Sequence, residues 1–274
     1  MLSIKNVAII GGRGLMGAWF SRFFIDQGCS VIISDAKKSG GVSNSGRYAV
    51  KVARSNADAV NGADLIIISV MMANFKDVIL QIAPYIKSNQ VVMDITSVKS
   101  APVGIMHKYI KKGIILGTHP MFGPGAGPEG QNFILTPSKP NEMKFAKEFS
   151  LYLRKNGFNV IIMDPRSHDN MIAAILSLTH FVGFVTAATW KELKIQKHAN
   201  SSSTSFRFLK SFVKSILDSS PELYSYLQTS VPNVCKMEES FIRNSIKWKE
   251  LARKKRSKEL AMLMSDLKSY IDSL

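Results

Sequence analysis

The stretch Val7-Ala8-Ile9-Ile10-Gly11-Gly12-Arg13-Gly14-Leu15-Met16-Gly17 decides the fold of the first half of the chain. Its first four residues are apolar and predict a buried strand, and a helical pattern follows over 18–27. Between the two, Gly12, Gly14 and Gly17 have the spacing G-x-G-x-x-G. Glycines at this spacing permit a tight turn, let a pyrophosphate approach the backbone and let the helix pack closely on the strand. We therefore predict a dinucleotide-binding turn, with a glycine-rich turn of an unrelated doubly wound fold as the alternative.

The second predicted strand ends at a carboxylate, Asp35, about 20 residues after the glycine turn. Dinucleotide-binding turns are followed by an acidic residue at about this distance. Asp35 can accept hydrogen bonds from both ribose hydroxyls of NAD, whereas it would repel the additional phosphate of NADP. Lys37 and Lys38 follow it closely and could weaken that preference, but we expect NAD rather than NADP. The predicted cofactor-binding residues are Gly12, Gly14, Leu15, Met16, Gly17 and Asp35.

Apolar runs alternate with helical patterns through the rest of the first half. The runs typical of buried strands are 7–10, 31–34, 65–70, 91–94, 114–118 and 160–163. Continuous apolar runs separated by helices indicate a parallel sheet that is covered on both faces. The fold class is therefore α/β, with a Rossmann-type doubly wound parallel sheet.

The pattern changes after Asp164-Pro165. Residues 166–195 carry apolar side chains at helical spacing, and further helical stretches follow over 206–217 and from Pro221. The last helical stretch has an apolar stripe, formed by Leu260, Leu263, Met264, Leu267 and Ile271. Such a stripe must face its own domain or a partner subunit. We predict a dinucleotide-binding domain over 1–165 and an all-helical substrate-binding and dimerisation domain over 166–274.

Composition indicates an ordinary globular protein, with 46% hydrophobic and 20% charged residues in 274. The longest apolar run, 63–73, falls short of the roughly 18 residues that cross a bilayer, so we expect no membrane partner. The first strand begins a few residues after Met1, which leaves no room for a cleaved signal peptide. Cys29 and Cys235 have neither disulfide nor metal-site spacing, so we expect a reducing, cytoplasmic location and no metal.

The net charge of +16 is unusual, and its densest cluster lies over 243–258. The cluster could bind a nucleic acid or a membrane surface, or could steer a dianionic substrate. A solvated helix face is the simplest interpretation. Because no nucleic-acid-binding motif accompanies the cluster, we expect no nucleic-acid partner.

Two further segments follow predicted strands, where ligands of open α/β sheets bind: 94–99 and 117–124. His119 in the second segment is the best candidate acid or base, because histidine titrates near neutrality and can accept a proton from an alcohol. The alternative is a hydrogen-bonded histidine without catalytic function. The Ser97 hydroxyl could hold the His119 ring in one tautomer.

Two more histidines lie in the predicted helical half. His180 is either a substrate ligand or a satisfied core histidine on an apolar helix. His168 precedes Asp169, and we interpret it as a residue that helps to start its helix rather than as a catalytic group.

The sequence resembles the prephenate dehydrogenase family in several segments that occur in the same order. They are the glycine turn, 94–99, 119–124, His168-Asp169 with His180-Phe181, and 205–207. The resemblance extends from about residue 5 to residue 245, and His-Pro-Met-Phe-Gly-Pro is its most specific piece. The string is most similar to the enterobacterial branch, although we expect no fused chorismate mutase segment. Some members carry a gating glutamate after this string, and no acid follows it immediately here.

The resemblance implies an oxidoreductase of tyrosine biosynthesis that transfers a hydride to NAD and releases carbon dioxide from prephenate or arogenate. It implies that His119 is the catalytic histidine and that Ser97 positions it. It further implies that Arg207 binds a substrate carboxylate, that His180 lies near the substrate, and that the protein is a homodimer through the helical domain. An internal ion pair is the alternative interpretation of Arg207.

Two other functions remain open from the residues alone. One is a β-hydroxyacid dehydrogenase or imine reductase, enzymes that join a similar nucleotide domain to helices but lack the His-Pro pair. The other is an NAD-binding regulatory protein without catalysis, whose basic segment would contact an acidic partner.

Overall fold

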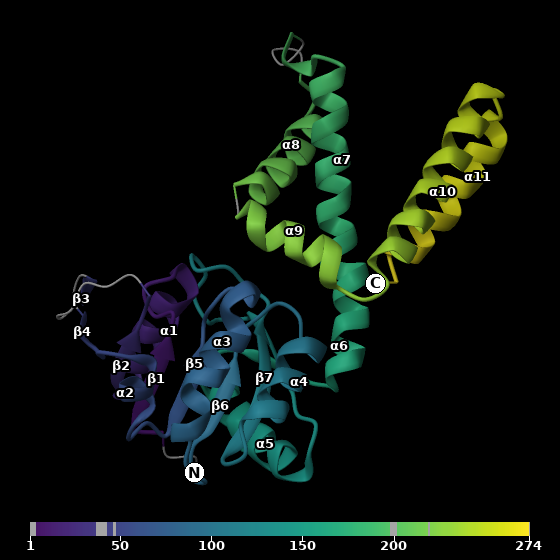
Figure 1. Cartoon of the computed structure of the whole chain (residues 1–274). Helices are drawn as coiled ribbons and strands as arrows, with labels where there is room; N and C mark the ends of the chain where they lie inside the picture. Colours follow the sequence, from purple (N-terminus) through teal and green to yellow (C-terminus); the bar gives the residue numbers. More distant parts are fainter. Residues whose placement is uncertain (1–3, 37–42, 46–47, 198–201, 219, 274) are drawn as a thin grey trace. The chain divides into compact units, whose positions relative to one another are not determined.

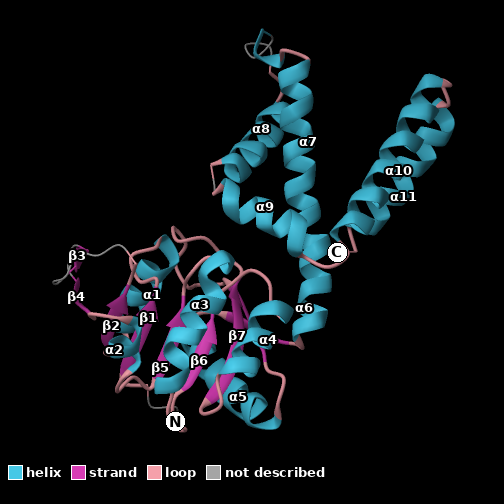
Figure 2. Ribbon diagram, in the orientation of Figure 1, coloured by secondary structure: helices cyan, strands magenta, loops and turns pink. Residues whose placement is uncertain are grey.

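A computed structural model describes residues 4–36, 43–45, 48–197, 202–218 and 220–273. The chain divides into two compact units, Met1–Asp169 and Asn170–Leu274 (Figure 1). The first unit holds the strands of the described chain and the second is helical, as Figure 2 shows by colour. The α/β class with an additional helical domain is thus confirmed. The division between the units falls four residues after the predicted boundary at 165.

The first unit is built on a nine-stranded sheet with the order β3-β4-β2-β1-β5-β6-β7-β8-β9. Most neighbouring strands are parallel, but β8 runs antiparallel to β7 and β3 antiparallel to β4. The strands are β1 Asn6–Ile10, β2 Ser30–Ser34, β3 Ser43–Ser45, β4 Tyr48–Val52, β5 Leu65–Ile68, β6 Val91–Asp94, β7 Ile114–Pro120, β8 Asn132–Thr136 and β9 Asn159–Ile162. The six predicted strands all form, whereas β3, β4 and β8 were not predicted.

Helices cover both faces of this sheet. They are α1 Leu15–Asp26, α2 Asn56–Val60, α3 Met72–Ile82, α4 Ser100–Tyr109 and α5 Pro140–Lys155, with a 3₁₀ turn at Ala83–Tyr85. Alternate residues of one strand enter two separate cores: Val7 and Ile9 pack with α1 and α5, whereas Ala8 and Ile10 pack with α2, α3 and α4. Burial on both faces explains why the strands are apolar throughout rather than alternating.

The second unit is made of helices and the turns between them. It contains the end of α6 Pro165–Ile172, a π-helical segment Ala173–Ser177, and α7 Leu178–Glu192, α8 Thr204–Leu217, α9 Pro221–Ser230, α10 Val234–Arg253 and α11 Ser257–Ile271. Helix α8 packs along α7, where Trp190 meets Phe206 with ring centroids 4.9 Å apart. Helix α10 contacts α7 through Phe181 and Phe241, whose ring centroids are 6.1 Å apart.

One helical run in the described chain, Pro165–Glu192, is long and apolar enough by composition to cross a membrane. Polar residues such as His168 and Thr179 are spaced along it, so it contains no long uninterrupted apolar run. Core helices of soluble proteins have the same length and composition, so these two properties do not distinguish a spanning helix from a core helix. Only 28% of its most apolar stretch is buried, so this helix carries apolar surface that the described chain does not cover.

Candidate active site

The glycine turn lies between β1 and α1, at the carboxyl end of β1. Gly14 is the N-cap residue of α1 and offers no side-chain hydrogen bond to the first backbone N–H groups of the helix. Those groups and the positive end of the helix dipole are available to an anion such as a phosphate.

The three motif glycines have different roles. A Cβ atom on Gly12 would lie 2.4 Å from the Cβ of Ile33, and one on Gly17 would lie 2.3 Å from the carbonyl oxygen of Gly11. A Cβ on Gly14 would meet only the oxygen of Gly11, at 3.3 Å. Gly12 and Gly17 are therefore required by close packing, whereas Gly14 leaves the outer surface of the turn clear for a ligand. This arrangement fits a pyrophosphate held against the backbone.

Asp35 stands directly after β2 and beside this turn. One of its carboxylate oxygens, Oδ2, accepts a hydrogen bond of 3.0 Å from the backbone N–H of Arg13. The carboxylate is half-buried, which leaves part of it accessible to ribose hydroxyls. Lys37 and Lys38, which could modify its preference, lie outside the described residues. The turn and Asp35 together fit NAD.

His119 lies near the carboxyl end of β7 and is buried. Its Nδ1 atom is 2.9 Å from Nε2 of His168, and Nδ1 of His168 is 2.9 Å from Oδ1 of Asp169. The ring of His168 is completely buried. Three titratable side chains thus form one hydrogen-bonded chain that begins at His119.

Asp169 is fixed at the far end of this chain. Its Oδ1 atom accepts a hydrogen bond of 2.7 Å from the backbone N–H of Lys99, and its Oδ2 atom accepts one of 2.8 Å from that of Ser100. Ser100 begins α4, so the carboxylate also lies at the positive end of a helix dipole. The hydrogen bonds from His168, Ser100 and Lys99 outweigh the opposing effect of burial, and the pKa of Asp169 is lowered.

These contacts determine the tautomers of both histidines. Asp169 is ionised and can only accept, so Nδ1 of His168 carries a proton and donates it. A neutral His168 then has its lone pair on Nε2 and must accept from Nδ1 of His119. A neutral His119 therefore has its own lone pair on Nε2, the atom that a general base needs.

The environment keeps both imidazoles neutral. The pKa of His119 lies well below its ordinary value, first because the ring is desolvated and then because His168 and Lys99 would repel a second positive charge; Asp169 opposes this only in part. Burial also lowers the pKa of His168. His119 is thus available as a base at neutral pH.

A second buried polar group supports the backbone beside His119. The ammonium group of Lys99 donates to the Asp94 carboxylate and to the carbonyl oxygen of Thr118, the residue before His119. Lys99 and Asp94 have fully buried side chains. The side chain of Lys99 therefore connects the end of β6 to β7 through hydrogen bonds. Its backbone N–H donates to Asp169.

Ser97 lies in the loop after β6 and is half-buried. Within the described part of the chain its hydroxyl makes no hydrogen bond, and the Nδ1 atom of His119 is engaged by His168 instead. His168 thus holds the His119 ring at Nδ1, and the role of Ser97 stays a prediction.

The two residues predicted on the helical unit are not brought together. His180 is buried near the start of α7 and lies against Tyr224, with ring centroids 4.1 Å apart. Arg207 is exposed and follows Phe206, which packs on Trp190, ten residues beyond His180 along α7. Ten residues of α-helix span roughly 15 Å, so Arg207 lies about three turns from His180. Its guanidinium contacts Thr204 at 3.2 Å.

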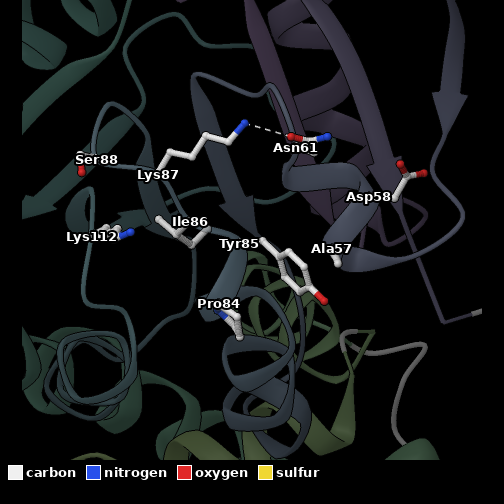
Figure 3. A pocket seen from close by; sticks show the side chains of 9 residues that line it. All are labelled: Ala57, Asp58, Asn61, Pro84, Tyr85, Ile86, Lys87, Ser88 and Lys112. Atoms are coloured by element: carbon white, nitrogen blue, oxygen red, sulfur yellow. Dashed lines mark hydrogen bonds between the residues drawn. The ribbon is translucent and has the colours of Figure 1, made fainter.

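A separate hollow of about 670 Å³ lies at the amino ends of the strands (Figure 3). It is lined by residues that precede the amino ends of the strands, including Asp58, Tyr85, Lys87 and Lys112. In Figure 3 the ammonium of Lys87 points to Asn61, at 3.0 Å. Parallel sheets bind their ligands at the carboxyl ends of their strands. The candidate active site therefore lies at those ends, with the glycine turn and His119, and not in this hollow.

Sequence reasoning missed His168, Asp169 and Lys99 as members of the site. The signal for the first two was the dipeptide His-Asp near the boundary between the predicted domains, which was interpreted as a helix start. Among the described residues, no group of three or more His, Cys, Asp or Glu side chains could hold a metal ion.

Two family models match the chain in succession. The nucleotide-binding domain of prephenate dehydrogenase matches residues 20–162, and the dimerization domain of prephenate dehydrogenase matches residues 164–266. The two matches meet at residue 163, six residues before the last residue of the first structural unit, Asp169.

Individual proteins agree with this match. The chain is 30% identical to the probable arogenate/prephenate dehydrogenase of Methanocaldococcus jannaschii over 98% of its own length and 61% of that protein's length. It is 27% identical to the T-protein of Haemophilus influenzae over 66% of its length and 44% of that protein's. The chain thus spans between 44% and 61% of the length of these relatives.

A solved structure has the same fold. The prephenate dehydrogenase of A. aeolicus, in complex with hydroxyphenyl propionate and NAD+, superposes with a TM-score of 0.76 at 22% identity, over 97% of each chain. The family models together cover most of the chain and match both of its structural units. The chain therefore belongs to the prephenate dehydrogenase family.

Proposed function

We propose that this protein oxidises and decarboxylates a cyclohexadienol, prephenate or arogenate, with NAD as the hydride acceptor, in tyrosine biosynthesis. The observation that carries the proposal is the buried chain His119–His168–Asp169, which leaves a lone pair on Nε2 of His119. His119 lies near the carboxyl ends of the parallel strands, where the glycine turn also offers a nucleotide site.

The proposed chemistry uses His119 as a general base. Its Nε2 atom accepts the proton of the substrate's ring hydroxyl, while Nδ1 remains hydrogen-bonded to His168. Asp169 stabilises the positive charge that then develops on the paired imidazoles. NAD, when bound, supplies the acceptor for the hydride that leaves the same ring carbon. Loss of carbon dioxide from the opposite ring carbon makes the ring aromatic, which drives the reaction.

NAD is favoured over NADP by the carboxylate of Asp35 beside the turn. The related structure from A. aeolicus was solved with NAD+, which supports the same choice. A comparison of the KM values for the two cofactors tests it, and equal values would contradict it.

Substrate binding by the helical unit remains a proposal for His180 and Arg207. His180 is the better placed of the two, because it is buried and has an unpaired Nδ1 atom among the described residues. Arg207→Ala tests the second: a KM that rises at least tenfold supports a carboxylate contact. An unchanged KM, with Lys210→Ala on the same exposed helix as control, would remove Arg207 from the site.

We propose a homodimer that forms through the helical unit. The matched family model is described as a dimerization domain, and the long apolar helix Pro165–Glu192 is covered by the described chain over only 28% of its most apolar stretch. Helix α11 likewise exposes Met264, Leu267 and Ile271. Sedimentation should show a dimer at micromolar concentration, and a monomer there would contradict the proposal.

We also propose a cytoplasmic location, because both cysteines, Cys29 and Cys235, are free thiols. The basic segment 243–258 lies on exposed helix ends, where Arg253 pairs with Glu250 and Arg256 with Glu259. These contacts support a solvated helix surface rather than a binding site.

One assay separates this function from its alternatives. The protein is mixed with NAD and either prephenate or arogenate, and reduced nicotinamide and the aromatic product are measured together. We expect both to form in equal amounts. Cofactor binding without turnover of either substrate would indicate an NAD-binding regulatory protein. Turnover of neither cyclohexadienol, together with oxidation of a β-hydroxyacid by NAD or reduction of an imine by reduced nicotinamide, would indicate the other dehydrogenase class.

A further inference from the structure

Arg13 is the charged residue of the glycine turn over 11–17, and the turn is fixed to the end of β2 by three hydrogen bonds. The backbone N–H groups of Gly11 and Gly12 donate to the carbonyl oxygen of Ser34, at 2.7 and 3.3 Å. The backbone N–H of Arg13 donates to Oδ2 of Asp35 at 3.0 Å. The backbone of Arg13 is therefore held directly beside the Asp35 carboxylate.

The side chains of Arg13 and Asp35 thus leave the backbone at the same end of the sheet, where the turn meets the end of β2. Both residues are half-buried, so part of each remains accessible to a ligand. The next residue, Gly14, is exposed and carries no side chain that would separate a nucleotide from them. The turn therefore presents a cationic side chain next to the carboxylate that is expected to accept the ribose hydroxyls.

The chemistry of these two side chains determines which dinucleotide binds. A carboxylate at this position repels the additional phosphate of NADP, whereas an arginine nearby accommodates it. The planar guanidinium of an arginine donates two parallel hydrogen bonds to phosphate oxygens, which adds to the attraction between the charges. At similar distances, the attraction by one positive charge and the repulsion by one negative charge are of similar size. A turn with both side chains should therefore tolerate a phosphate that a carboxylate alone would exclude.

We propose that Arg13 is a specificity-determining residue that binds the additional phosphate of NADP, so that this protein accepts NADP as a second cofactor while Asp35 keeps NAD the better one. The assignment rests on the proposed dehydrogenase function for its reaction and on the glycine turn for its site. The additional phosphate lies on the adenosine ribose and not on the nicotinamide, so the hydride transfer is the same with either cofactor.

Titration calorimetry with NAD and with NADP, in the absence of substrate, tests the assignment independently of turnover. The wild-type protein should bind both cofactors, and NAD more tightly. Arg13→Ala should weaken the binding of NADP at least tenfold more than the binding of NAD, since hydrogen bonds between charged groups are lost. Arg22→Ala is the matched control, because it removes the same charge from a half-buried position further along α1. The ratio of the two Kd values should stay as in the wild type.

A second set of variants separates Arg13 from the other charges near the turn. In Asp35→Ser the repulsion is removed, so Arg13 should make NADP the preferred cofactor. The double variant Arg13→Ala/Asp35→Ser should lose that preference. Lys37 and Lys38 follow Asp35 closely in sequence, and replacing both with Ala should weaken NADP binding less than Arg13→Ala does.

Three results would overturn the assignment: no binding of NADP to the wild-type protein, equal losses for NAD and NADP in Arg13→Ala, or a larger loss of NADP binding in the lysine variant. Equal losses would make Arg13 a ligand of the pyrophosphate that both cofactors share. A protein that binds NADP through Arg13 but oxidises neither cyclohexadienol would contradict the proposed function and leave the assignment intact. Thermal melts of each variant show that the fold is retained.

Discussion

The Nδ1 atom of His119 lies 2.9 Å from Nε2 of His168, and this single contact connects a strand-end histidine to a carboxylate that it does not touch. His168 contacts Asp169 at 2.9 Å through its other ring nitrogen. Because Asp169 can only accept, the proton position on each ring follows from the one before it. The tautomer of His119, and with it the nitrogen proposed as the base, is thus determined by a residue two hydrogen bonds away.

Asp169→Asn should therefore damage catalysis more than it damages the fold. An asparagine can donate to His168, which would reverse the tautomers along the chain and place a proton on Nε2 of His119. We expect kcat to fall by about 10²–10⁴, by comparison with the loss of an orienting carboxylate in serine proteases. Steady-state kinetics with a thermal melt of each protein measures both effects.

Asp164→Asn is a control for the same substitution. The Asp164 side chain accepts hydrogen bonds from the backbone N–H groups of Arg166 and Ser167 at the start of α6, and only its backbone carbonyl, which the substitution keeps, accepts from the backbone N–H of His168. Its loss should leave kcat within about twofold. If the two variants had the same kcat, the tautomer chain would be wrong.

His168 should act only through His119. We expect His168→Leu to lower kcat by at least tenfold, since it removes the acceptor that holds Nδ1 of His119. In the background of His119→Asn, however, the same change should have almost no further effect, because residues that act as a unit are not additive. Independent, multiplicative losses in the double variant would show that His168 has some other role.

The pH profile should show a base with a depressed pKa. Burial lowers the pKa of His119 well below that of a free histidine, so the ring remains neutral on the acid side of neutrality. We expect kcat/KM to stay constant from neutral pH to about pH 6.5 and to fall only at lower pH. An acid limb with a midpoint above it would contradict the environment described for this ring.

The same shift makes the protein less stable in acid. The unfolded chain binds a proton at His119 near pH 6.5 and the folded chain does not, so unfolding takes up protons in this range. The free energy of unfolding should fall as the pH falls from about 6.5 toward the folded pKa. His119→Gln should show a weaker dependence in denaturant titrations over that window.

The motif glycines separate folding from cofactor binding. In Gly17→Ala the new Cβ would lie 2.3 Å from the backbone of Gly11, so we expect a destabilisation of about 1–3 kcal/mol. In Gly14→Ala the nearest atom is at 3.3 Å, so the melting temperature should change little while the affinity for NAD falls. Calorimetry and NAD titration of both variants measure this, and a Gly14→Ala protein that binds NAD normally would contradict a pyrophosphate at the turn.

Much of the first unit could be predicted from the sequence because its strands are buried on both faces. A run such as Leu65–Ile68 is apolar at every position and is recognisable without any partner. Strand β8 was missed because it follows a glycine-rich loop and begins with a polar residue, and because its antiparallel pairing with β7 depends on contacts distant in sequence. Propensity alone does not contain those contacts.

From the sequence, a site residue could be proposed only where its place at the end of a predicted strand was informative by itself. His119 was proposed from the sequence because it lies near the end of a strand, on the side of the sheet where ligands of parallel sheets bind. His168 and Asp169 were not, because the bond to His119 joins residues 49 positions apart and only the fold brings them together. Lys99 was missed for a related reason: a lysine is expected at the surface, whereas here Asp94 and the carbonyl of Thr118 stabilise it in a fully buried position.

The most direct test of the proposed base is His119→Asn, assayed with NAD and each of the two cyclohexadienols. Asparagine keeps a polar side chain in the buried position but cannot accept the hydroxyl proton at Nε2. We predict that kcat falls by about 10²–10⁴ while the melting temperature and the affinity for NAD remain near those of the wild type. A variant that turns over either substrate at the wild-type rate would show that His119 is not the base.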